Sequence, residues 1–389
     1  MKRLIILLLS AALAGCASVM PAPAPTALFA DAGFAPPSEP VSADGLFKLS
    51  PAMRSYLNSP AFHQLLRNRG ARHGLVEALY SKTDLKLEYE SKITRTAAET
   101  YEARSGNCLS LVIMTAAFAK ALGMPVHFQS IHTDDLWSRA GGLYLASNHV
   151  NITLGERPAD IQRGYDPERH LVVDFIPRDE AARLRSRQLE EEDIVALYLN
   201  NRAAESLVQQ RVNDAYWWAK AAVSARPGAA SPLNTLGVVY QRHGDLALAK
   251  QTFRAALLRE PENLAVLRNL QPLLVTLGRP LEAQELAKRI AGIEPYPPYH
   301  FFDQGMVALK AGDFGEARQL FEREVKRAPY NDEFRFWLGI AHLRLGHLSD
   351  AREHIALAVN NSTSSDMRQV YSNKLHYLRT LGQTGTRIR

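Results

Sequence analysis

The stretch from Arg104 to Leu122 reads RSGNCLSLVIMTAAFAKAL, and it decides how the first half of the chain is interpreted. Gly106-Asn107 is a turn signal, and the residues after Cys108 are almost all apolar or small until Gly123. This pattern predicts a largely buried helix with Cys108 at or just inside its N-terminus. Unpaired backbone N–H groups and the positive end of the helix dipole lie there, and both favour thiolate over thiol. Cys108 is therefore a candidate nucleophile, and a buried cysteine that only packs in the core is the alternative.

Two later segments supply candidate partners for this thiol. A thiol nucleophile needs a base, and the base needs a group that orients it. Residues 148–154 alternate polar and apolar side chains, which predicts a half-buried strand carrying His149. Residues 170–175 read as a second short strand, and it carries Asp174. His149 is the candidate base and Asp174 the candidate orienting group.

Taken in this order, these features resemble the transglutaminase-like superfamily, over about residues 90–180. The matching motifs are RSGNCLSL, ALGMPV, NHV and VVDF. The resemblance implies an α+β fold of the papain-like cysteine type, in which a cysteine opens a helix and the histidine and aspartate lie on adjacent strands. It also implies that Cys108 is the nucleophile, His149 the base and later the acid, and Asp174 the group that fixes the imidazole tautomer.

Two assignments around this triad stay open. Asp166 or Asp179 could replace Asp174 if the strand ends elsewhere. The backbone N–H of Cys108 is one candidate to stabilise an oxyanion, and the side chain of Gln129 is another.

A metal site near the triad is the weaker interpretation of a second group of residues. His127 and His132 flank residues 128–131, which read FQSI, and Asp134, Asp135 and Trp137 follow. The chain contains no His-Glu-x-x-His or Cys-x-x-Cys spacing, so a strand followed by a polar loop is the simpler interpretation. Trp137 could wall an acyl-substrate cleft or could belong to the core. No glycine-rich phosphate loop is present, and we predict no metal and no cofactor.

The N-terminus predicts a lipoprotein signal peptide over residues 1–15. A positive Met1–Arg3 precedes an apolar run that is too short to span a bilayer, which takes about 20 residues. The run ends in LAGC, which resembles the lipobox of bacterial lipoproteins and implies lipidation of Cys16. An ordinary secretory signal with an incidental cysteine is the alternative. Ala17 rather than aspartate after the cysteine implies sorting to the outer membrane, facing the periplasm.

From about residue 196 onward, prolines and small residues recur every 34 residues. The recurring positions are Pro227, Pro261, Pro295 and Pro329; Gly244, Gly278, Gly312 and Gly346; and Ala249, Ala283, Ala317 and Ala351. The alanines let two antiparallel helices approach closely, the glycines end the first helix of each pair, and the prolines stop the second. The pattern resembles tetratricopeptide repeats, whose period is 34 residues. It predicts an all-α solenoid.

The period divides the solenoid into five units and a cap. The units are 196–229, 230–263, 264–297, 298–331 and 332–365, and a capping helix is expected over 367–381. Gly237, Gly305 and Gly339 form a further small-residue register. The third unit has Gln271 in that register and Pro272 beside it, so we expect a kinked or shortened helix there.

The predicted organisation is therefore a signal peptide over 1–15, a Pro/Ala-rich tether over 16–45, a transglutaminase-like domain over 46–195 and a tetratricopeptide array over 196–389. The chain has only two cysteines, so lipidation of Cys16 leaves Cys108 without a disulfide partner. The formal net charge of +6 is spread along the helices, with no basic run interleaved with aromatics, and we predict no nucleic-acid partner.

Two classes of function fit the sequence. In the first, the Cys108 thiolate attacks an amide or peptide carbonyl, and hydrolysis or acyl transfer follows. In the second, the thiol domain is vestigial and the chain is an adaptor whose repeats recruit a protein or peptide. The two can be combined if the array selects the polypeptide on which the thiol acts. In either class the membrane is a partner through the lipidated N-terminus.

Overall fold

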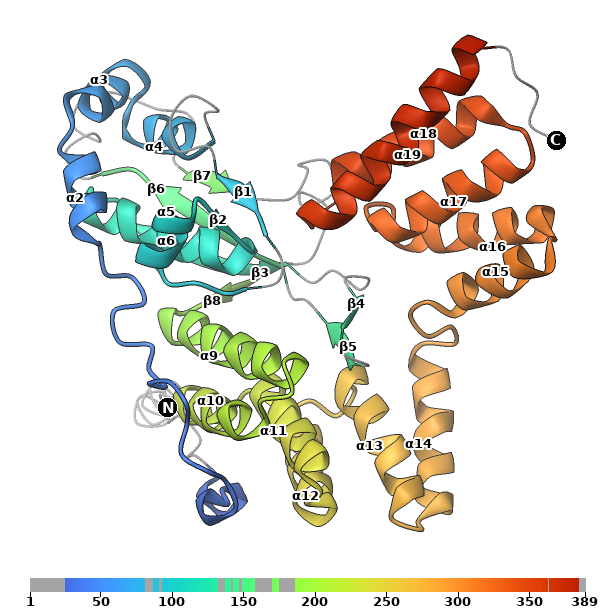
Figure 1. The fold of residues 1–389 in the computed structure, drawn as a ribbon. Helices are drawn as coiled ribbons and strands as arrows, with labels where there is room; N and C mark the ends of the chain where they lie inside the picture. The colour runs from blue at the N-terminus through green and yellow to red at the C-terminus, as the bar shows by residue number, and fades with distance from the viewer. Residues whose placement is uncertain are drawn as a thin grey trace, which may run out of the picture.

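The computed structural model describes residues 25–80, 87–90, 93–131, 137–140, 143–146, 149–157, 170–174, 186–362 and 364–384. Figure 1 shows a sheet with helices against it, followed by a curved array of helix pairs. The predicted signal peptide and Cys16 lie outside the described residues, as do Asp166 and Asp179. Within the described part of the chain, no helix is both long and apolar enough to cross a bilayer.

The helices of the first part begin where the sequence offers a cap. They are α2 (Pro51–Leu57), α3 (Pro60–Arg69), α4 (Ala71–Tyr80), α5 (Ala97–Ala103) and α6 (Cys108–Ala121). Ser50 and Ser59 each accept a hydrogen bond from a backbone N–H in the first turn of α2 and α3, and a proline follows each serine. Thr96 and Glu99 form a capping box at α5. These caps fix where the chain turns before it reaches α6.

The main sheet has four antiparallel strands in the order β7-β6-β3-β8. Their bounds are β3 (Val126–Ile131), β6 (His149–Gly155), β7 (His170–Val173) and β8 (Ser186–Leu189). Two small sheets join β1 (Glu88–Tyr89) to β2 (Ser105–Gly106) and β4 (Trp137–Ala140) to β5 (Leu143–Ala146). The two strands predicted to carry His149 and Asp174 are therefore neighbours in one sheet, β6 and β7.

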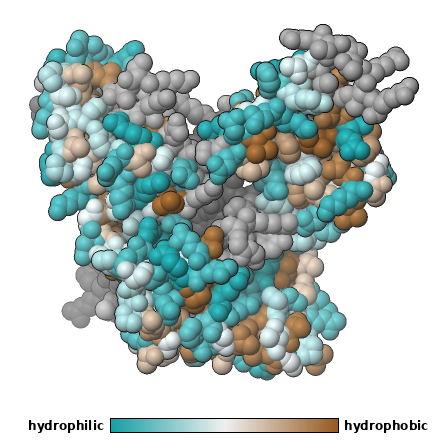
Figure 2. Space-filling view, viewed as in Figure 1, coloured by the Kyte–Doolittle hydropathy of each residue, from teal (hydrophilic) through white to brown (hydrophobic). Residues whose placement is uncertain are grey.

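The second part consists of five helix pairs and a last helix. The pairs are α9 (Glu191–Val208) with α10 (Val212–Ala225), α11 (Ala230–His243) with α12 (Leu246–Arg259), α13 (Leu264–Thr276) with α14 (Pro280–Ile293), α15 (His300–Ala311) with α16 (Phe314–Arg327), and α17 (Asp332–Arg344) with α18 (Leu348–Asn361); α19 (Ser365–Thr384) follows. The four glycines predicted to end first helices all have positive φ, which an L side chain rarely adopts. In Figure 1 the array curves round until α17–α19 face the sheet part across a notch, which is also visible in Figure 2.

Close helix contact explains the second glycine register. A Cβ built on Gly237 would lie 2.5 Å from the ring of Phe253, and one on Gly305 would lie 2.7 Å from Phe321. These glycines let a large side chain of the second helix reach the backbone of the first. The third unit reverses the sizes, with Gln271 where the others have glycine and Ala287 where they have the large residue.

Pro272 does not shorten its helix, so the expected shortening is wrong, and the expected kink stays a prediction. It lies inside α13, which has 13 residues, the same length as α17. Leu270, Leu273 and Leu274 beside it are buried. Their burial offsets the roughly 3 kcal/mol that proline costs inside a helix.

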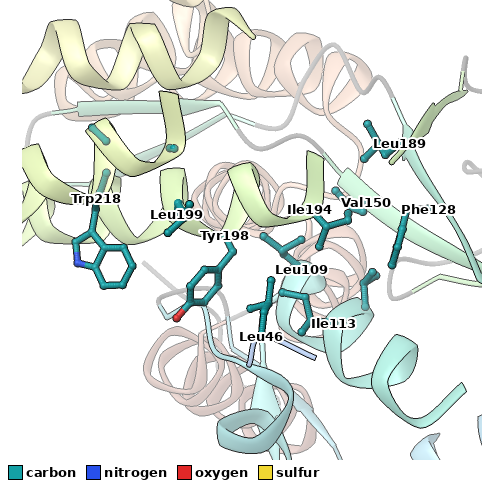
Figure 3. Close-up of a cluster of buried hydrophobic side chains, with 14 of the residues drawn as sticks. Leu46, Leu109, Ile113, Phe128, Val150, Leu189, Ile194, Tyr198, Leu199 and Trp218 are labelled. Carbon is teal, nitrogen blue, oxygen red and sulfur yellow. The ribbon is translucent and has the colours of Figure 1, made fainter. Parts of the chain in front are cut away.

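One apolar core runs through the sheet part and the first three repeats without a break. Ile194, Tyr198 and Leu199 of α9 pack with Leu109 of α6 and Val150 of β6 (Figure 3). Because α9 begins at Glu191, the predicted domain boundary at residues 195 and 196 falls inside this helix. The first repeat is thus built into the sheet part.

The predicted tether over residues 16–45 is wrong for residues 25–45, which pack against the first two repeats. The ring of Phe34 stacks on Tyr216 with centroids 3.9 Å apart, and the Tyr216 hydroxyl donates to Asp31 at 2.6 Å. Ser38 donates its backbone N–H to Asp214 at 2.7 Å. The proline-rich segment therefore packs on aromatic and acidic side chains of α10, and we call residues 25–50 the strap.

The apolar core is interrupted between the third and fourth repeats. Within the described chain, the first core ends on α14 at Ala283 and its half-buried neighbour Leu286, and a second core starts at Tyr299. Ion pairs join the two sides, from Glu294 to Arg268 on α13 and to Arg327 on α16. The last two repeats are thus held to the rest largely by polar contacts.

The glycine register predicts opposite effects for two matched substitutions. Gly237→Ala should lower the free energy of unfolding by about 1–3 kcal/mol, because the new Cβ overlaps Phe253. Gly292→Ala on α14, where no atom lies within 4 Å of the new Cβ, should raise it by about 0.5–1 kcal/mol. Urea denaturation of both variants checks this, and an unchanged or increased stability for Gly237→Ala would contradict it.

Candidate active site

Cys108 is the first residue of α6, and it is half-buried. Asn107 caps the helix, because its side-chain oxygen accepts the backbone N–H of Ser110 at 2.9 Å. The sequence-predicted placement of the sulfur at a helix N-terminus is therefore what the structure has. The unpaired N–H groups of the first turn are available to a negative charge on or beside that sulfur.

The approach to Cys108 is a tight turn. Arg104 ends α5 in the left-handed region with φ of 54°. A Cβ on Gly106 would lie 2.7 Å from the Cβ of Ser110, so the position admits only glycine without a shift of α6. Gly106 also accepts the backbone N–H of Glu90 at 3.0 Å. The turn thus leads from the end of α5 to the start of α6 within a few residues.

His149 opens β6 and is 3% exposed. Its Nε2 lies 2.5 Å from Oδ1 of Asp174, whose side chain is 5% exposed. Asn151 donates its side-chain N–H to the other oxygen of Asp174 at 3.2 Å. Both carboxylate oxygens therefore have a partner, and the carboxylate holds the imidazole in one orientation.

Strand register brings these side chains to one face of the sheet. Ile152 pairs with Val173, so the next position along places Asn151 opposite Asp174. His149 lies two residues before Asn151, on the same face and diagonal to Asp174. Gln129 pairs with Asn151 from the other side, on β3, so it shares this face.

Opposing effects act on the imidazole of His149. Burial lowers its pKa, but hydrogen bonds to Asp174 and Cys108 and the charges of both groups outweigh burial and raise the pKa to about 9. The stability that this histidine contributes is therefore fully present below pH 6.5 and is lost as the pH rises through about 9. At neutral pH the imidazole is held as a cation between a carboxylate and a sulfur.

The structure thus brings together all three sequence-predicted site residues: Cys108, His149 and Asp174. Their catalytic roles stay predictions. Sequence reasoning missed Asn151 as a partner of Asp174, although its place two residues after His149 in an alternating strand was a usable signal. Gln129 lies on the face expected of an oxyanion donor. His127, on β3, is exposed.

A buried polar network links the helix N-terminus to the first repeat. The Asn107 side chain donates to Thr94 Oγ1 at 2.7 Å, and Asn201 of α9 donates to the same atom at 3.2 Å. The backbone N–H of Thr94 donates to Glu205 of α9 at 2.7 Å. Thr94 is fully buried and Asn107 is 8% exposed. Two residues of α9 therefore position the cap that starts α6.

Glu205 is an unusual member of this network. Burial raises its pKa to about 7, although Thr94 donates to it and Arg202 lies nearby. An acid with a raised pKa contributes stability that is fully present below its ordinary value of 4.5 and is lost as the pH rises through about 7.

Substituting Glu205 should change how stability depends on pH. From pH 5 to pH 8, the free energy of unfolding of Glu205→Gln should rise by roughly 1–3 kcal/mol relative to that of the unsubstituted protein, because the amide never ionises. Urea denaturation at both pH values measures this, with the exposed Glu102→Gln as the control that should show no such gain. An equal difference between Glu205→Gln and the unsubstituted protein at both pH values would rule out the proposed titration.

Comparisons with known proteins identify the repeats. A tetratricopeptide repeat model matches residues 302–366. Solved structures that resemble the chain include YrrB, described as a TPR protein with an unusual peptide-binding site (21% identity, 46% of this chain and 92% of that one, TM-score 0.25). Another is Pseudomonas aeruginosa pilF, with 18% identity over 49% of this chain and 94% of that one and a TM-score of 0.28. A thermophilic TPR protein of Thermus thermophilus has 18% identity over 46% of this chain and 98% of that one and a TM-score of 0.29.

The predicted tetratricopeptide array is confirmed by the family model. No curated protein sequence matches the chain. The matched residues lie in the fourth and fifth repeats, so the match does not bear on the sheet part. The transglutaminase-like resemblance and the lipoprotein signal stay predictions.

Proposed function

We propose that the protein is a thiol enzyme that acts on amide or peptide bonds through Cys108, His149 and Asp174. The observation that supports this most is the buried His149–Asp174 pair, 2.5 Å apart, with its imidazole hydrogen-bonded to a cysteine at a helix N-terminus. A histidine that only supports the fold does not require a cysteine sulfur beside it, and an unreactive cysteine does not require an imidazole. Their pairing therefore favours a catalytic role.

The proposed reaction has two steps. The Cys108 thiolate attacks the carbonyl carbon, and the C–N bond breaks as His149 gives its proton to the leaving amine, which leaves a thioester. Water or a second amine then attacks the thioester; His149 takes its proton, and the thiolate is released. Since Nε2 of His149 is engaged by Asp174, Nδ1 is the nitrogen suited to exchange these protons. The backbone N–H of Cys108 and the side chain of Gln129 are the proposed oxyanion donors.

The tetratricopeptide array supports a polypeptide substrate. Such repeats generally bind proteins or peptides along a curved surface. The array here curves back towards the sheet part, and its first helix shares the buried network of the Cys108 helix. We propose that the array recruits the polypeptide whose amide the thiol attacks. With lipid on Cys16, these substrates would be periplasmic, near the outer membrane.

A non-catalytic adaptor is the competing proposal, and thiol reactivity distinguishes the two. Iodoacetamide should alkylate Cys108 at pH 7 faster than it alkylates free cysteine. His149→Ala should slow this reaction at least about tenfold, because the cation that stabilises the thiolate is lost. The exposed His127→Ala on neighbouring β3 is the matched control and should leave the rate unchanged. Mass spectrometry of the modified peptide gives the rates.

Product chemistry gives the second part of this test. Peptides carrying carboxamides, incubated with the protein, should lose ammonia and gain water or an amine, and Cys108→Ala should abolish the change. An unactivated rate of alkylation, equal in the His149→Ala variant, would contradict the enzyme and favour the adaptor.

A further inference from the structure

We propose that the turn between α17 and α18 is a binding site for Zn²⁺ or a similar divalent transition metal, with His342, His347 and Asp350 as ligands. This site lies in the fifth repeat and does not depend on the proposed thiol chemistry. It departs from the sequence-based expectation of no metal, because its ligands are spaced across a helix–turn–helix rather than as His-Glu-x-x-His.

The ligand geometry fits a tetrahedral metal. One ligand atom from each residue lies within 4.8 Å of the others. Nδ1 of His342 is 3.5 Å from Oδ2 of Asp350. Bonds of about 2.0–2.1 Å to zinc put tetrahedral ligands roughly 3.3 Å apart, so small side-chain rotations complete the site. Two imidazoles and a carboxylate are ligands that zinc commonly takes, with a water or a further ligand in the fourth position.

The buried nitrogen of His342 supplies an independent reason for a ligand. The side chain is 8% exposed, and within the described chain its Nδ1 has no hydrogen-bond partner. Asp350 faces this nitrogen without meeting the geometry of a hydrogen bond. Buried polar atoms in native proteins are nearly always paired, so an unpaired nitrogen aimed at a carboxylate and a second imidazole points to a missing cation.

The three proposed ligands lie on one short segment, residues 342–350, at the turn from α17 to α18. Gly346 turns the chain with φ of 80°, and the backbone N–H of His347 donates to the carbonyl of His342 at 2.9 Å. His347 is the residue before α18, and its side chain makes no capping hydrogen bond. Asp350 lies in the first turn of the same helix. The backbone therefore brings the three ligand residues together without a metal ion.

The repeat register shows that histidine is exceptional here. The positions equivalent to His342 in earlier repeats are Ala308, Leu274 and Tyr240, and those equivalent to His347 are Asp313, Arg279 and Asp245. The repeat fold thus needs no imidazole at either position. His354, whose ring lies 5.3 Å from that of His342, stands where the other repeats include Leu320 and Leu286.

The surroundings of His342 favour the neutral form of its imidazole. Burial lowers the pKa of His342, and the charge of Arg318 acts in the same direction against those of Asp350 and Glu322. Burial also lowers the pKa of His354, with help from His342 and Arg335. Neutral imidazole is the form that binds a metal.

Titration with ZnCl₂ tests the site in the full chain prepared without a polyhistidine tag. A background with Cys16→Ser and Cys108→Ala removes both thiols of the chain as competing ligands. Competition with a chelating dye should show one Zn²⁺ bound per chain. His347→Ala and Asp350→Ala should each weaken binding by at least about 100-fold, since loss of even an outer partner of a ligand weakens it about 10–100-fold. Both residues are exposed, so circular dichroism should show both variants folded.

The matched control is His376→Ala, which removes an exposed histidine from α19 and should leave the affinity unchanged. X-ray absorption should report nitrogen and oxygen ligands with no sulfur. Binding that is equally strong in His347→Ala and Asp350→Ala, or no Zn²⁺ bound at micromolar concentration, would overturn the proposal.

Discussion

The side chain of Asn107 makes the contacts on which the rest of the candidate site depends. Its oxygen accepts from both the backbone and the hydroxyl of Ser110, and its nitrogen donates to Thr94. A helix cap of this kind is worth about 1 kcal/mol, and a buried one whose side chain makes three hydrogen bonds is worth more. The larger consequence is positional. The cap decides that α6 starts at Cys108, and a start one residue later would rotate the sulfur away from His149.

The same contacts tie the site to the helical array. Thr94, which holds Asn107, is itself held by Asn201 and Glu205 of α9. Apolar side chains of α9 also belong to the core of the sheet part, and the strap packs on the first two repeats and donates a hydrogen bond to α10. The first repeat is therefore a component of the thiol part, whereas ion pairs of Glu294 connect the third repeat to the fourth. A ligand that repositions α9 would act directly on the cap.

Much of this arrangement could be predicted from local pattern. The period of 34 residues predicted the helix pairs. In four of them a glycine at positive φ ends the first helix, and Gly237 leaves room for the ring of Phe253, so both requirements appear in the local sequence. The turn before Cys108 and the alternation around His149 gave the helix and strand that carry them. The contacts between distant segments could not be predicted in this way. The sequence around Asp31 does not indicate a contact with Tyr216, and the sequence around Thr94 does not indicate one with Glu205. These hydrogen bonds form only when α9 and α10 pack on the first part of the chain.

The proposed chemistry depends on His149 being held as a cation between Asp174 and Cys108, and a nuclear magnetic resonance titration of its imidazole tests this directly. His149 should lose its proton near pH 9, and Cys108→Ala should move this midpoint to lower pH. A midpoint near the ordinary value of 6.5 in both proteins would contradict the account and leave a folded helical array beside an unactivated thiol.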